Sequence, residues 1–458
     1  MRFVIIGGDA AGMSAASRAR RNNPDLEIVV LEQGEDVSYS ACNIPYNIAD
    51  PHREIDDLVV RSAATFREKL GIDLRTGHRV ERIDRAAKTV SGQTGDGAAF
   101  TLPYDQLLIA TGAEPIRPPI AGIDLPGVFM VKNLEHGRQI KHFLRHRQAK
   151  RAVIIGMGYI ALEMVEALTE RGLGIDLIKP RPGLLPWLAP ELAQPVRQVL
   201  QARGVGLFDG YPVERIVPAG ETLAVVSGAL RLEADLVIGA IGVTPNARLA
   251  KEAGLALSVG GSIAVDRGLR TSDPAIFAAG DCTDSYHLVT GDKTWIPLAL
   301  RANRAGWAVA DNVCGAGVEL PGVAGTAVFK VFEMQVARSG LSLDEARKAG
   351  FDPVSVQITS HSRAAIYPGA QPVHVAMVGD RASGRLLGAQ MTGIDQVAHR
   401  INAVAVALLA KMSVADFSQG DLAYAPPFGP TWDPLLVAAN QLLKKLAATS
   451  LPDMAPAP

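Results

Sequence analysis

The chain has 458 residues, 48% of them hydrophobic and 20% charged, and its formal net charge is -1. This near-neutral balance excludes the strongly basic surface of a protein that binds nucleic acid or a membrane surface, and the length indicates two or three domains. The three cysteines, at positions 42, 282 and 314, are odd in number and far apart, which argues against a disulfide framework and indicates a reducing compartment.

The N-terminus runs directly into a short apolar strand, residues 2–6, and this run is too short for a signal peptide. The most apolar later segment, residues 401–410, is about half a membrane span and predicts a buried helix. We therefore expect a cytoplasmic protein that contacts no membrane.

A strand–turn–helix–strand unit opens the chain: residues 2–6, a glycine turn, a helix to about residue 21, and a second strand over residues 26–32. The turn keeps the first and third glycines of the G-x-G-x-x-G dinucleotide pattern but has an aspartate at the second, and a glutamate ends the second strand. An acid there binds an adenosine ribose and the helix N-terminus binds a diphosphate, so we expect a dinucleotide site rather than a turn without a ligand. The residues concerned are Gly7, Asp9, Ala10, Ala11, Gly12 and Glu32.

The same pattern returns at residues 151–179, with a full G-x-G-x-x-A turn. The strand after its helix leads into Lys179 and Arg181, at the place where an acid would suit a free ribose 2′-hydroxyl. Two cations suit a 2′-phosphate instead, so we expect NADPH, with NADH as the alternative. The competing interpretation is that the two cations are solvated loop charges. The turn contributes Gly156, Gly158, Tyr159 and Ile160.

Two dinucleotide units in one chain favour a flavin beside a nicotinamide. A strand within residues 102–115 ends in the tight turn of residues 110–112, and the segment 271–281 ends in Asp281, ahead of a helix that starts near Pro297. A carboxylate there can accept hydroxyls from a ribityl chain, and the helix N-terminus can stabilise a reduced isoalloxazine.

The remaining segments complete the expected organisation. Residues 53–72 predict a helix, and strands are expected near residues 234–241. From about residue 324 the chain alternates strand-like stretches with two helices and predicts a separate α+β domain, followed by a Pro/Ala-rich tail that predicts disorder.

In this order of motifs the chain resembles the pyridine nucleotide-disulfide oxidoreductases over about residues 1–445. The resemblance implies an α/β chain with two Rossmann-like dinucleotide-binding domains, for FAD and NAD(P)H, and a C-terminal α+β dimerisation domain that forms a homodimer. It also places Glu163 near the nicotinamide. The expected domains are 1–112 and 246–322 for FAD, 113–245 for NAD(P)H, 323–446 for dimerisation and 447–458 for a disordered tail.

Cys42 decides the branch of this family. The glutathione-reductase branch uses two cysteines four residues apart and a C-terminal His-Glu pair, and this chain has neither. NADH peroxidases and oxidases resemble G-x-x-H-x-G in the first turn, where this chain has Ala10. The pattern S-x-x-x-C-x-x-P-Y, Ser38 to Tyr46, is similar to coenzyme A-disulfide reductases and persulfide reductases, and their two C-terminal tyrosines match Tyr367 and Tyr424. No residues remain for the rhodanese domain that many persulfide reductases carry.

The resemblance implies that the Cys42 thiolate attacks a disulfide or persulfide of coenzyme A, forming a mixed disulfide. We expect the helix at the first glycine turn and a nearby flavin to favour the thiolate, and a tyrosine to protonate the leaving sulfur. The alternatives are an NAD(P)H oxidase or peroxidase that cycles through a Cys42 sulfenic acid, and a non-catalytic coenzyme A-binding redox sensor.

Further residues are expected at these ligands. Those at the cofactors are Gln33, Ser40, Val80, Ala110, Thr111, Gly112, Gly242, Gly280, Pro297, Leu298 and Ala299. Those at the coenzyme A portion, which could equally be solvated, are Arg18, Arg21, Ser38, Asn43, Lys69 and Asn303, with Arg61 and Arg67 near Lys69 on the same predicted helix. We expect no metal site at His142 and His146, and we expect Cys282 and Cys314 to fill the core.

Overall fold

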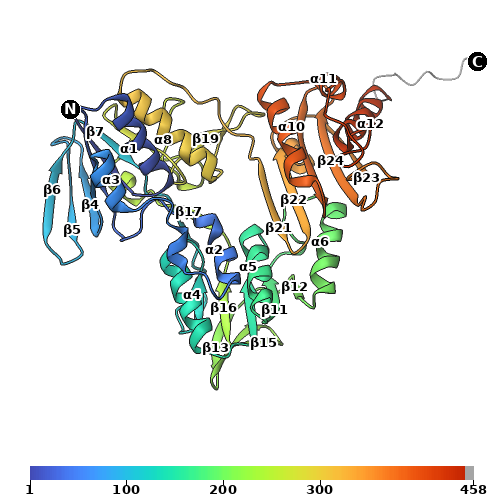
Figure 1. Cartoon of the computed structure of the whole chain (residues 1–458), viewed down its shortest axis with the longest axis horizontal. Coiled ribbons are helices and arrows are strands. Elements are labelled where there is room, and N and C mark those ends of the chain that lie inside the picture. Colours follow the sequence, from blue (N-terminus) through green and yellow to red (C-terminus); the bar gives the residue numbers. More distant parts are fainter. Residues whose placement is uncertain (449–458) are drawn as a thin grey trace, which may run out of the picture.

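The computed structural model describes residues 1–448 and divides into three lobes (Figure 1). The N-terminal lobe is built on an all-parallel sheet with the order β18-β7-β1-β2-β3. Its apolar strands are buried on both faces, as parallel strands require. The strands are β1 Arg2–Ile6, β2 Glu27–Leu31, β3 Asp73–Arg75, β7 Gln106–Ile109 and β18 Ile276–Ala278.

Two helices lie against each other on this sheet: α1 (Ala10–Asn22) and α8 (Ala299–Val313), which form the upper part of the lobe in Figure 1. They approach closely because Gly306 faces α1, where an added Cβ would lie 2.2 Å from the Ala11 carbonyl oxygen. The segments that complete the lobe are α3 Ala63–Leu70, α7 Arg248–Glu252, and the strands β4 His78–Asp84, β5 Thr89–Thr94, β6 Ala99–Pro103, β19 Ser285–Tyr286 and β20 Lys293–Thr294.

The central lobe repeats the design with the parallel sheet β12-β11-β10-β16-β9. Its strands are β9 Val128–Met130, β10 Arg151–Ile155, β11 Gly174–Lys179, β12 Gly206–Asp209 and β16 Leu236–Gly239, beside the meander β13 Arg215–Ala219, β14 Thr222–Ser227 and β15 Leu230–Ala234. Its helices are α2 Ile44–Ala49, α4 Leu134–His146, α5 Tyr159–Glu170 and α6 Pro190–Ala202.

After β7 the chain passes between these two lobes twice more, along neighbouring paths. It leaves the first sheet after β7 through β8 (Ala113–Pro115) and returns through β17 (Val243–Pro245). These two short strands pair antiparallel, and the Asn246 amide donates to the Gly112 carbonyl at 2.9 Å.

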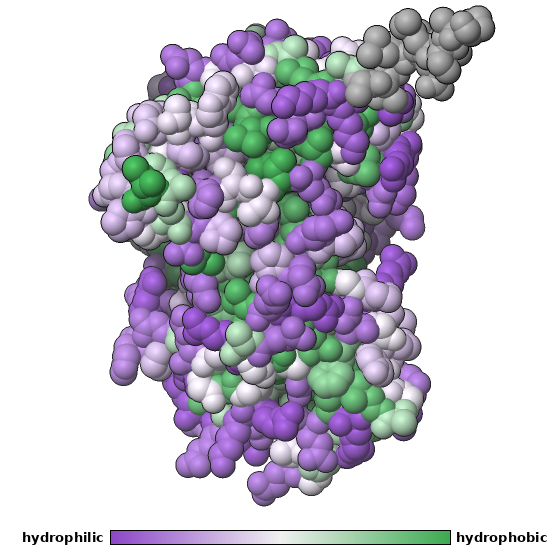
Figure 2. Space-filling model, turned by 90° about the vertical axis from the view of Figure 1, so that its right-hand side faces the viewer, coloured by the Kyte–Doolittle hydropathy of each residue, from purple (hydrophilic) through white to green (hydrophobic). Residues whose placement is uncertain are grey.

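The C-terminal lobe is an antiparallel sheet, β21-β22-β25-β24-β23, covered by helices. Its strands are β21 Ala327–Val331, β22 Met334–Gly340, β23 Pro353–His361, β24 Pro372–Asp380 and β25 Leu386–Gly393, and its helices are α9 Leu343–Lys348, α10 Val397–Leu409, α11 Val414–Ser418 and α12 Pro434–Ala448. Figure 2 looks onto this side of the molecule and shows hydrophobic residues exposed among hydrophilic ones.

The expected α/β class with two Rossmann-type domains and a C-terminal domain is confirmed, with three local corrections. The helix predicted over residues 53–72 is a 3-10 turn, Ile55–Leu58, followed by extended residues and then α3, because Ser62 caps α3 by accepting the Thr65 amide at 3.3 Å. Arg61 therefore precedes α3. Four helices, not two, cover the described part of the C-terminal sheet.

The predicted disordered tail divides at residue 448. Residues 447 and 448 continue α12, whereas residues 449–458 lie outside the described residues. Among residues 1–448, no helix combines the length and the hydropathy needed to cross a bilayer.

Candidate active site

The first glycine turn joins three segments that are far apart in sequence. Gly7 has φ +110°, and a Cβ there would lie 2.3 Å from the Ala110 carbonyl oxygen, while a Cβ on Gly12 would lie 2.0 Å from the Gly7 oxygen. Only glycine allows the turn to pack this closely against residues 110–112. The N-terminus of α1 is thereby presented beside the carboxyl ends of β1 and β7, where parallel sheets bind ligands.

Glu32 stands at the end of β2 with both carboxylate oxygens held by the backbone. One oxygen accepts the Gly8 amide at 2.7 Å and the other accepts the Gly34 amide at 2.8 Å. Burial raises the pKa of this carboxyl, although the backbone amides oppose the shift. Gln33 and the β4 neighbours of Val80 line an adjacent pocket of 410 Å³, so the acid and this pocket together offer a place for an adenosine.

Asp9 occupies the position where the dinucleotide pattern has its second glycine. Its carboxylate accepts the Tyr39 amide at 3.3 Å, and burial raises its pKa to about 6. The Ser38 amide donates to the Gly8 carbonyl at 2.9 Å. The glycine turn therefore also anchors the segment that leads to Cys42.

Asp281 reaches the same place from the other end of the sheet. It follows β18 and Gly280, and its carboxylate pairs with the Lys132 ammonium at 3.2 Å. The Trp295 indole donates to the Asp281 carbonyl at 2.8 Å. Lys132 was missed by the sequence analysis because it lies in no motif and is 149 residues from its partner.

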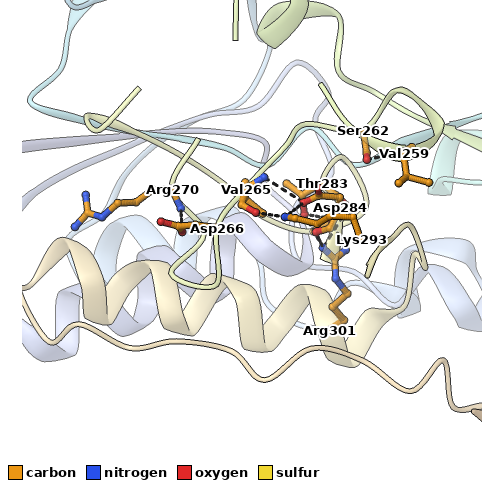
Figure 3. A network of polar contacts seen from close by, with 10 residues as sticks. Val259, Ser262, Val265, Asp266, Arg270, Thr283, Asp284, Lys293 and Arg301 are labelled. Carbon is orange, nitrogen blue, oxygen red and sulfur yellow. Dashed lines mark hydrogen bonds and ion pairs between the residues drawn. The ribbon is translucent and has the colours of Figure 1, made fainter. Parts of the chain in front are cut away.

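The Arg301 side chain extends toward Thr283 and Asp284, which follow Asp281 in the chain, as Figure 3 shows. Its buried guanidinium, on the first turns of α8, donates to the carbonyls of Gly280 at 2.9 Å and Thr283 at 3.2 Å, which bracket Asp281. It also bonds the Asp284 carbonyl, and the fully buried Asp284 carboxylate accepts the Lys293 ammonium at 3.0 Å. The loop is thus fixed relative to the N-terminus of α8, at Leu298 and Ala299 beside Pro297.

These features fit FAD. A glycine cradle that a Cβ would fill, a ribose-binding acid at the end of β2, a carboxylate for the ribityl chain and a helix N-terminus converge at one edge of the first sheet. The residues expected there from sequence are brought together, and Lys132 and Arg301 are added to them.

The second glycine turn repeats the backbone geometry with a different charge. Gly156 has φ +127°, and a Cβ there would lie 2.2 Å from the Ala240 carbonyl oxygen, whereas Gly158 borders open space. At the end of β11 the Lys179 ammonium donates to the Gly183 carbonyl at 2.6 Å, and Arg181 is exposed. Burial lowers the pKa of Lys179, Asp209 opposes this shift and Arg181 adds to it. A phosphate between Lys179 and Arg181 would relieve the repulsion between these two cations. Gly242, at φ +119°, lies where the chain turns back after β16.

Cys42 lies in a 3-10 turn, Ala41–Asn43, directly before α2. The Ser40 amide donates to the Leu58 carbonyl at 2.8 Å, and the Asn43 side chain donates to the Ser40 hydroxyl at 2.8 Å. The far end of α2 is tied to α4 by the buried Lys141 ammonium, which donates to the Asn47 carbonyl at 2.7 Å. The 3-10 turn that carries the sulfur and the helix α2 that follows it therefore form one short segment that is anchored at both ends.

The protein groups around Cys42 disfavour its thiolate, contrary to the sequence-based expectation. The residue is exposed to solvent, but its sulfur lies against protein groups, so partial burial and then the Glu163 carboxylate raise its pKa, while Lys132 opposes the shift. Carboxylates therefore outweigh the single cation near the sulfur.

The Tyr46 hydroxyl donates to the Glu163 carboxylate at 3.0 Å, which joins α2 to α5. Burial raises the pKa of Glu163 to about 7. Glu166, one turn further along α5, is bonded to the Lys330 ammonium and accepts the Phe332 amide at 2.9 Å. Tyr46 belongs to the motif around Cys42, but the motif alone gives no role for its hydroxyl.

The expected coenzyme A residues lie on several elements: Ser38 and Asn43 are in the Cys42 segment, Lys69 is on α3, and Arg18, Arg21 and Asn303 are on α1 and α8. On α1 and α8, Arg18 forms a bidentate pair with Asp311 at 2.7 and 2.8 Å, and Asn303 accepts the Ser14 hydroxyl at 2.6 Å. Arg21 and Lys69 are exposed. Arg18 is thus already paired, which reduces the charge that it offers to a phosphate.

Tyr367 and Tyr424 lie in loops of the C-terminal lobe, and within residues 1–448 neither forms a hydrogen bond with the Cys42 segment. Tyr424 is 50% exposed, and the apolar Ile366, Phe428 and Trp432 near these tyrosines in sequence are 98%, 69% and 62% exposed. Such a patch is typical of an interface.

Four further residues with sequence-based expectations lie away from Cys42: two cysteines and two histidines. Cys282 is fully buried as expected, whereas Cys314 is exposed at the end of α8, so the prediction that it fills the core is wrong. The His142 and His146 rings stack at 4.2 Å, and no group of three metal-ligating side chains occurs among the described residues.

Comparison with known proteins agrees with this geometry. Residues 1–306 match the family described as pyridine nucleotide-disulphide oxidoreductase, and residues 326–434 match its dimerisation domain. A protein named NADH oxidase from Methanocaldococcus jannaschii is 34% identical, with 98% of this chain and 100% of that protein covered. The NAD(P)H coenzyme A polysulfide/persulfide reductase of Pyrococcus horikoshii is 35% identical, with 96% and 98% covered.

A solved structure extends the likeness to three dimensions. The NAD-dependent persulfide reductase from A. fulgidus superposes with a TM-score of 0.94 at 37% identity, and the match covers 98% of this chain and 84% of that one.

Proposed function

Because the chain belongs to the pyridine nucleotide-disulphide oxidoreductase family, we propose that it is an FAD-dependent reductase that uses NAD(P)H to reduce a disulfide or persulfide of coenzyme A at Cys42. Bound FAD supplies the two-electron transfer between the nicotinamide and sulfur. The observation that carries the proposal is the solitary Cys42: Cys282 is buried in the core and Cys314 lies at the far end of α8. A cysteine that has no disulfide partner in its own chain can form a reversible disulfide only with a molecule from outside the chain.

The chemistry balances for either substrate. The Cys42 thiolate attacks one sulfur of RSSR, forms Cys42–S–S–R and releases RS⁻, which takes a proton. Two electrons from NAD(P)H then break the mixed disulfide, restore the thiolate and release the second thiol after protonation. The sum is NAD(P)H + H⁺ + RSSR → NAD(P)⁺ + 2 RSH, and a persulfide RSSH gives RSH and H₂S instead.

We further infer that the enzyme prefers NADPH, acts as a homodimer and works in the cytoplasm. Lys179 and Arg181 stand where an acid would bind a free 2′-hydroxyl, and exposed thiols suit a reducing compartment. The exposed apolar patch beside Tyr367 and Tyr424 supports a dimer, in which these tyrosines would reach Cys42 of the other protomer and donate a proton to the leaving sulfur.

A second candidate is an NAD(P)H oxidase in which Cys42 cycles through a sulfenic acid, favoured by the exposed thiol and by the likeness to a protein named NADH oxidase. Ala10 argues against it, because NADH oxidases resemble G-x-x-H-x-G in this turn and have a histidine at that position.

Cys42→Ser separates these readings. We expect the variant to keep its FAD and to accept electrons from NADPH, but to lose turnover with coenzyme A disulfide by at least 10³-fold, because serine cannot form the mixed disulfide. Cys314→Ser is the matched control and should match the wild type. Turnover by Cys42→Ser within tenfold of the wild type would disprove the proposal, whereas oxygen consumption far above disulfide reduction in the wild type would favour the oxidase.

A further inference from the structure

Tyr46 stands between the reactive sulfur and a second ionisable group. Cys42 and Tyr46 are four residues apart at the start of α2, so they lie about one helical turn from each other. Helix α2 packs against α5, as Figure 1 shows, and the Tyr46 hydroxyl donates to the Glu163 carboxylate at 3.0 Å. The Tyr46 hydroxyl is therefore bonded to Glu163, and both Tyr46 and Glu163 lie close enough to Cys42 for their charges to interact with it.

Glu163 is in turn connected to solvent by a pocket. The pocket has a volume of 140 Å³ and lies between α2, α5 and β21. Its lining includes Tyr46, Glu163 and Glu166 on the inside and the exposed Glu170 and Lys330 at its rim. Glu166 is bonded to Lys330 and the Phe332 amide, and Glu170 lies at the exposed rim, so Glu163 is the pocket carboxyl that is bonded to Tyr46.

The ionisation of Cys42 and the ionisation of Glu163 are coupled through their charges. The Glu163 carboxylate raises the pKa of the Cys42 thiol, so thiolate and carboxylate disfavour each other and the pair tends to hold one proton between them. Glu163 itself has a pKa of about 7, because burial and Glu166 raise it more than the Tyr46 hydrogen bond lowers it.

The other charges near these groups are few. Lys132 favours the Cys42 thiolate, whereas Asp281 and Asp9 oppose it. The Tyr46 hydroxyl feels Glu163, Glu166 and Cys42, and together with burial these raise its pKa, so it stays protonated at neutral pH and can accept one proton only while it passes on another.

We propose that Tyr46 and Glu163 form a proton relay that connects Cys42 with the solvent in the α2–α5–β21 pocket. The inference rests on the proposed function, because each turnover, NAD(P)H + H⁺ + RSSR → NAD(P)⁺ + 2 RSH, consumes one proton from solvent. Glu163 holds that proton while Cys42 is a thiolate, and Tyr46 passes it to the sulfur side when a thiolate leaves. The relay differs from the tyrosines of the C-terminal lobe because it lies entirely within one protomer.

The first test measures the state of Cys42 without turnover. The FAD-containing enzyme is alkylated with iodoacetamide between pH 5.5 and 9.5, and the Cys42 and Cys314 peptides are quantified by mass spectrometry, so that Cys314 is an internal control. We expect the Cys42 rate to show an inflection near pH 7 that reports Glu163. In Glu163→Gln this inflection should disappear, and the rate at pH 7.5 should rise roughly threefold to tenfold, because the opposing carboxylate is gone. In Tyr46→Phe the inflection should move to higher pH.

The second test measures proton delivery. We expect kcat with coenzyme A disulfide to fall roughly 100-fold in Tyr46→Phe, with KM for NADPH within twofold of the wild type, because a positioned proton donor contributes about 10²-fold or more. The control is Tyr104→Phe, which removes a buried hydroxyl with no hydrogen-bond partner within residues 1–448, and it should change neither measurement.

The outcomes are distinct from those for the proposed function. A Cys42 alkylation profile in Glu163→Gln that superposes on the wild type, or a kcat in Tyr46→Phe within twofold of the wild type, would overturn the relay. Cys42→Ser with near-normal turnover would overturn the proposed function alone, since the alkylation test needs no substrate.

Discussion

The turn after β1 and the turn after β10 have the same backbone shape and different chemistry. Gly7 and Gly156 both have positive φ. A Cβ added to either glycine would lie within 2.3 Å of a backbone carbonyl oxygen just after the neighbouring strand. At the end of the following strand, however, Glu32 is held by two backbone amides, whereas Lys179 and the exposed Arg181 offer positive charge. Close packing between strand and helix requires glycine at both positions, whereas a few side chains at the sheet edge determine which dinucleotide suits each turn.

The two turns differ also in how much else depends on them. The first turn anchors the Cys42 segment through Gly8 and Asp9 and faces residues 110–112 and α8. Gly158 of the second turn borders open space. The same substitution should therefore be more damaging in the first turn than in the second.

The largest expected effect comes from the paired changes Gly7→Ala and Gly156→Ala. Both place a Cβ against a backbone oxygen at positive φ, which costs about 3 kcal/mol or more. Gly7→Ala should lose FAD, while Gly156→Ala should keep FAD and lose reduction by NADPH. The ratio of flavin to protein absorbance, thermal denaturation and anaerobic flavin bleaching measure these outcomes.

Gly158→Ala is the matched control for this pair, because its backbone is extended and no atom lies within 4 Å of the new Cβ. Its melting temperature should equal that of the wild type. Equal FAD loss from Gly7→Ala and Gly156→Ala would show that the two domains do not act separately.

A smaller effect is expected from reversing the charge at the second turn. Lys179→Glu should lower kcat/KM for NADPH relative to NADH by roughly tenfold to a hundredfold, because a charge-assisted phosphate contact contributes about 1.5 to 3 kcal/mol. Lys150→Glu is the control, since Lys150 is exposed before β10, at the opposite edge of the same sheet. Steady-state kinetics with both cofactors decide the matter, and a wild-type preference for NADH would contradict the assignment.

The smallest effect concerns Asp9, which has no counterpart in the second turn. Its pKa is raised to about 6 by burial, so it contributes stability that is complete below the ordinary carboxyl pKa and is lost as the pH rises through 6. Asp9→Asn keeps an acceptor for the Tyr39 amide and does not titrate. Relative to the wild type it should gain about 1 to 2 kcal/mol between pH 4.5 and pH 8.

Urea unfolding at the two pH values measures this gain, and Gly158→Asn in the second turn serves as a variant that adds no titrating group. A constant difference between Asp9→Asn and the wild type at both pH values would mean that Asp9 is already ionised at pH 4.5.

Much of this arrangement could be predicted from the sequence because backbone geometry leaves few choices. A glycine turn between a buried strand and a helix, with an acid at the end of the next strand, follows from steric limits and from hydrogen bonding to a ribose. The start of α3 could have been read from Ser62, a strong helix cap, and was missed because residues 53–72 were treated as one helix.

The partners across the site could not be predicted in this way. Lys132 pairs with Asp281 and Tyr46 with Glu163 over separations of 149 and 117 residues, and no local pattern links the members of either pair. Arg301 looks like any helix arginine until its carbonyl partners are known. The rise of the Cys42 pKa that the protein groups cause could not be predicted for the same reason, because the carboxylates near the sulfur come from α5 and two loops.

The pairing of β8 with β17 makes the central lobe a removable unit. Its first and last residues are hydrogen-bonded neighbours, so the whole insert begins and ends at one point on the N-terminal lobe. Insertions with adjoining ends are the kind that proteins accept and exchange without disturbing the host. A central lobe from a relative with the opposite nicotinamide preference could therefore be transplanted between Ala113 and Pro245 with two splice points. The new segment must keep a lysine at position 132 and a glutamate at position 163, because these side chains contact Asp281 and Tyr46 of the host.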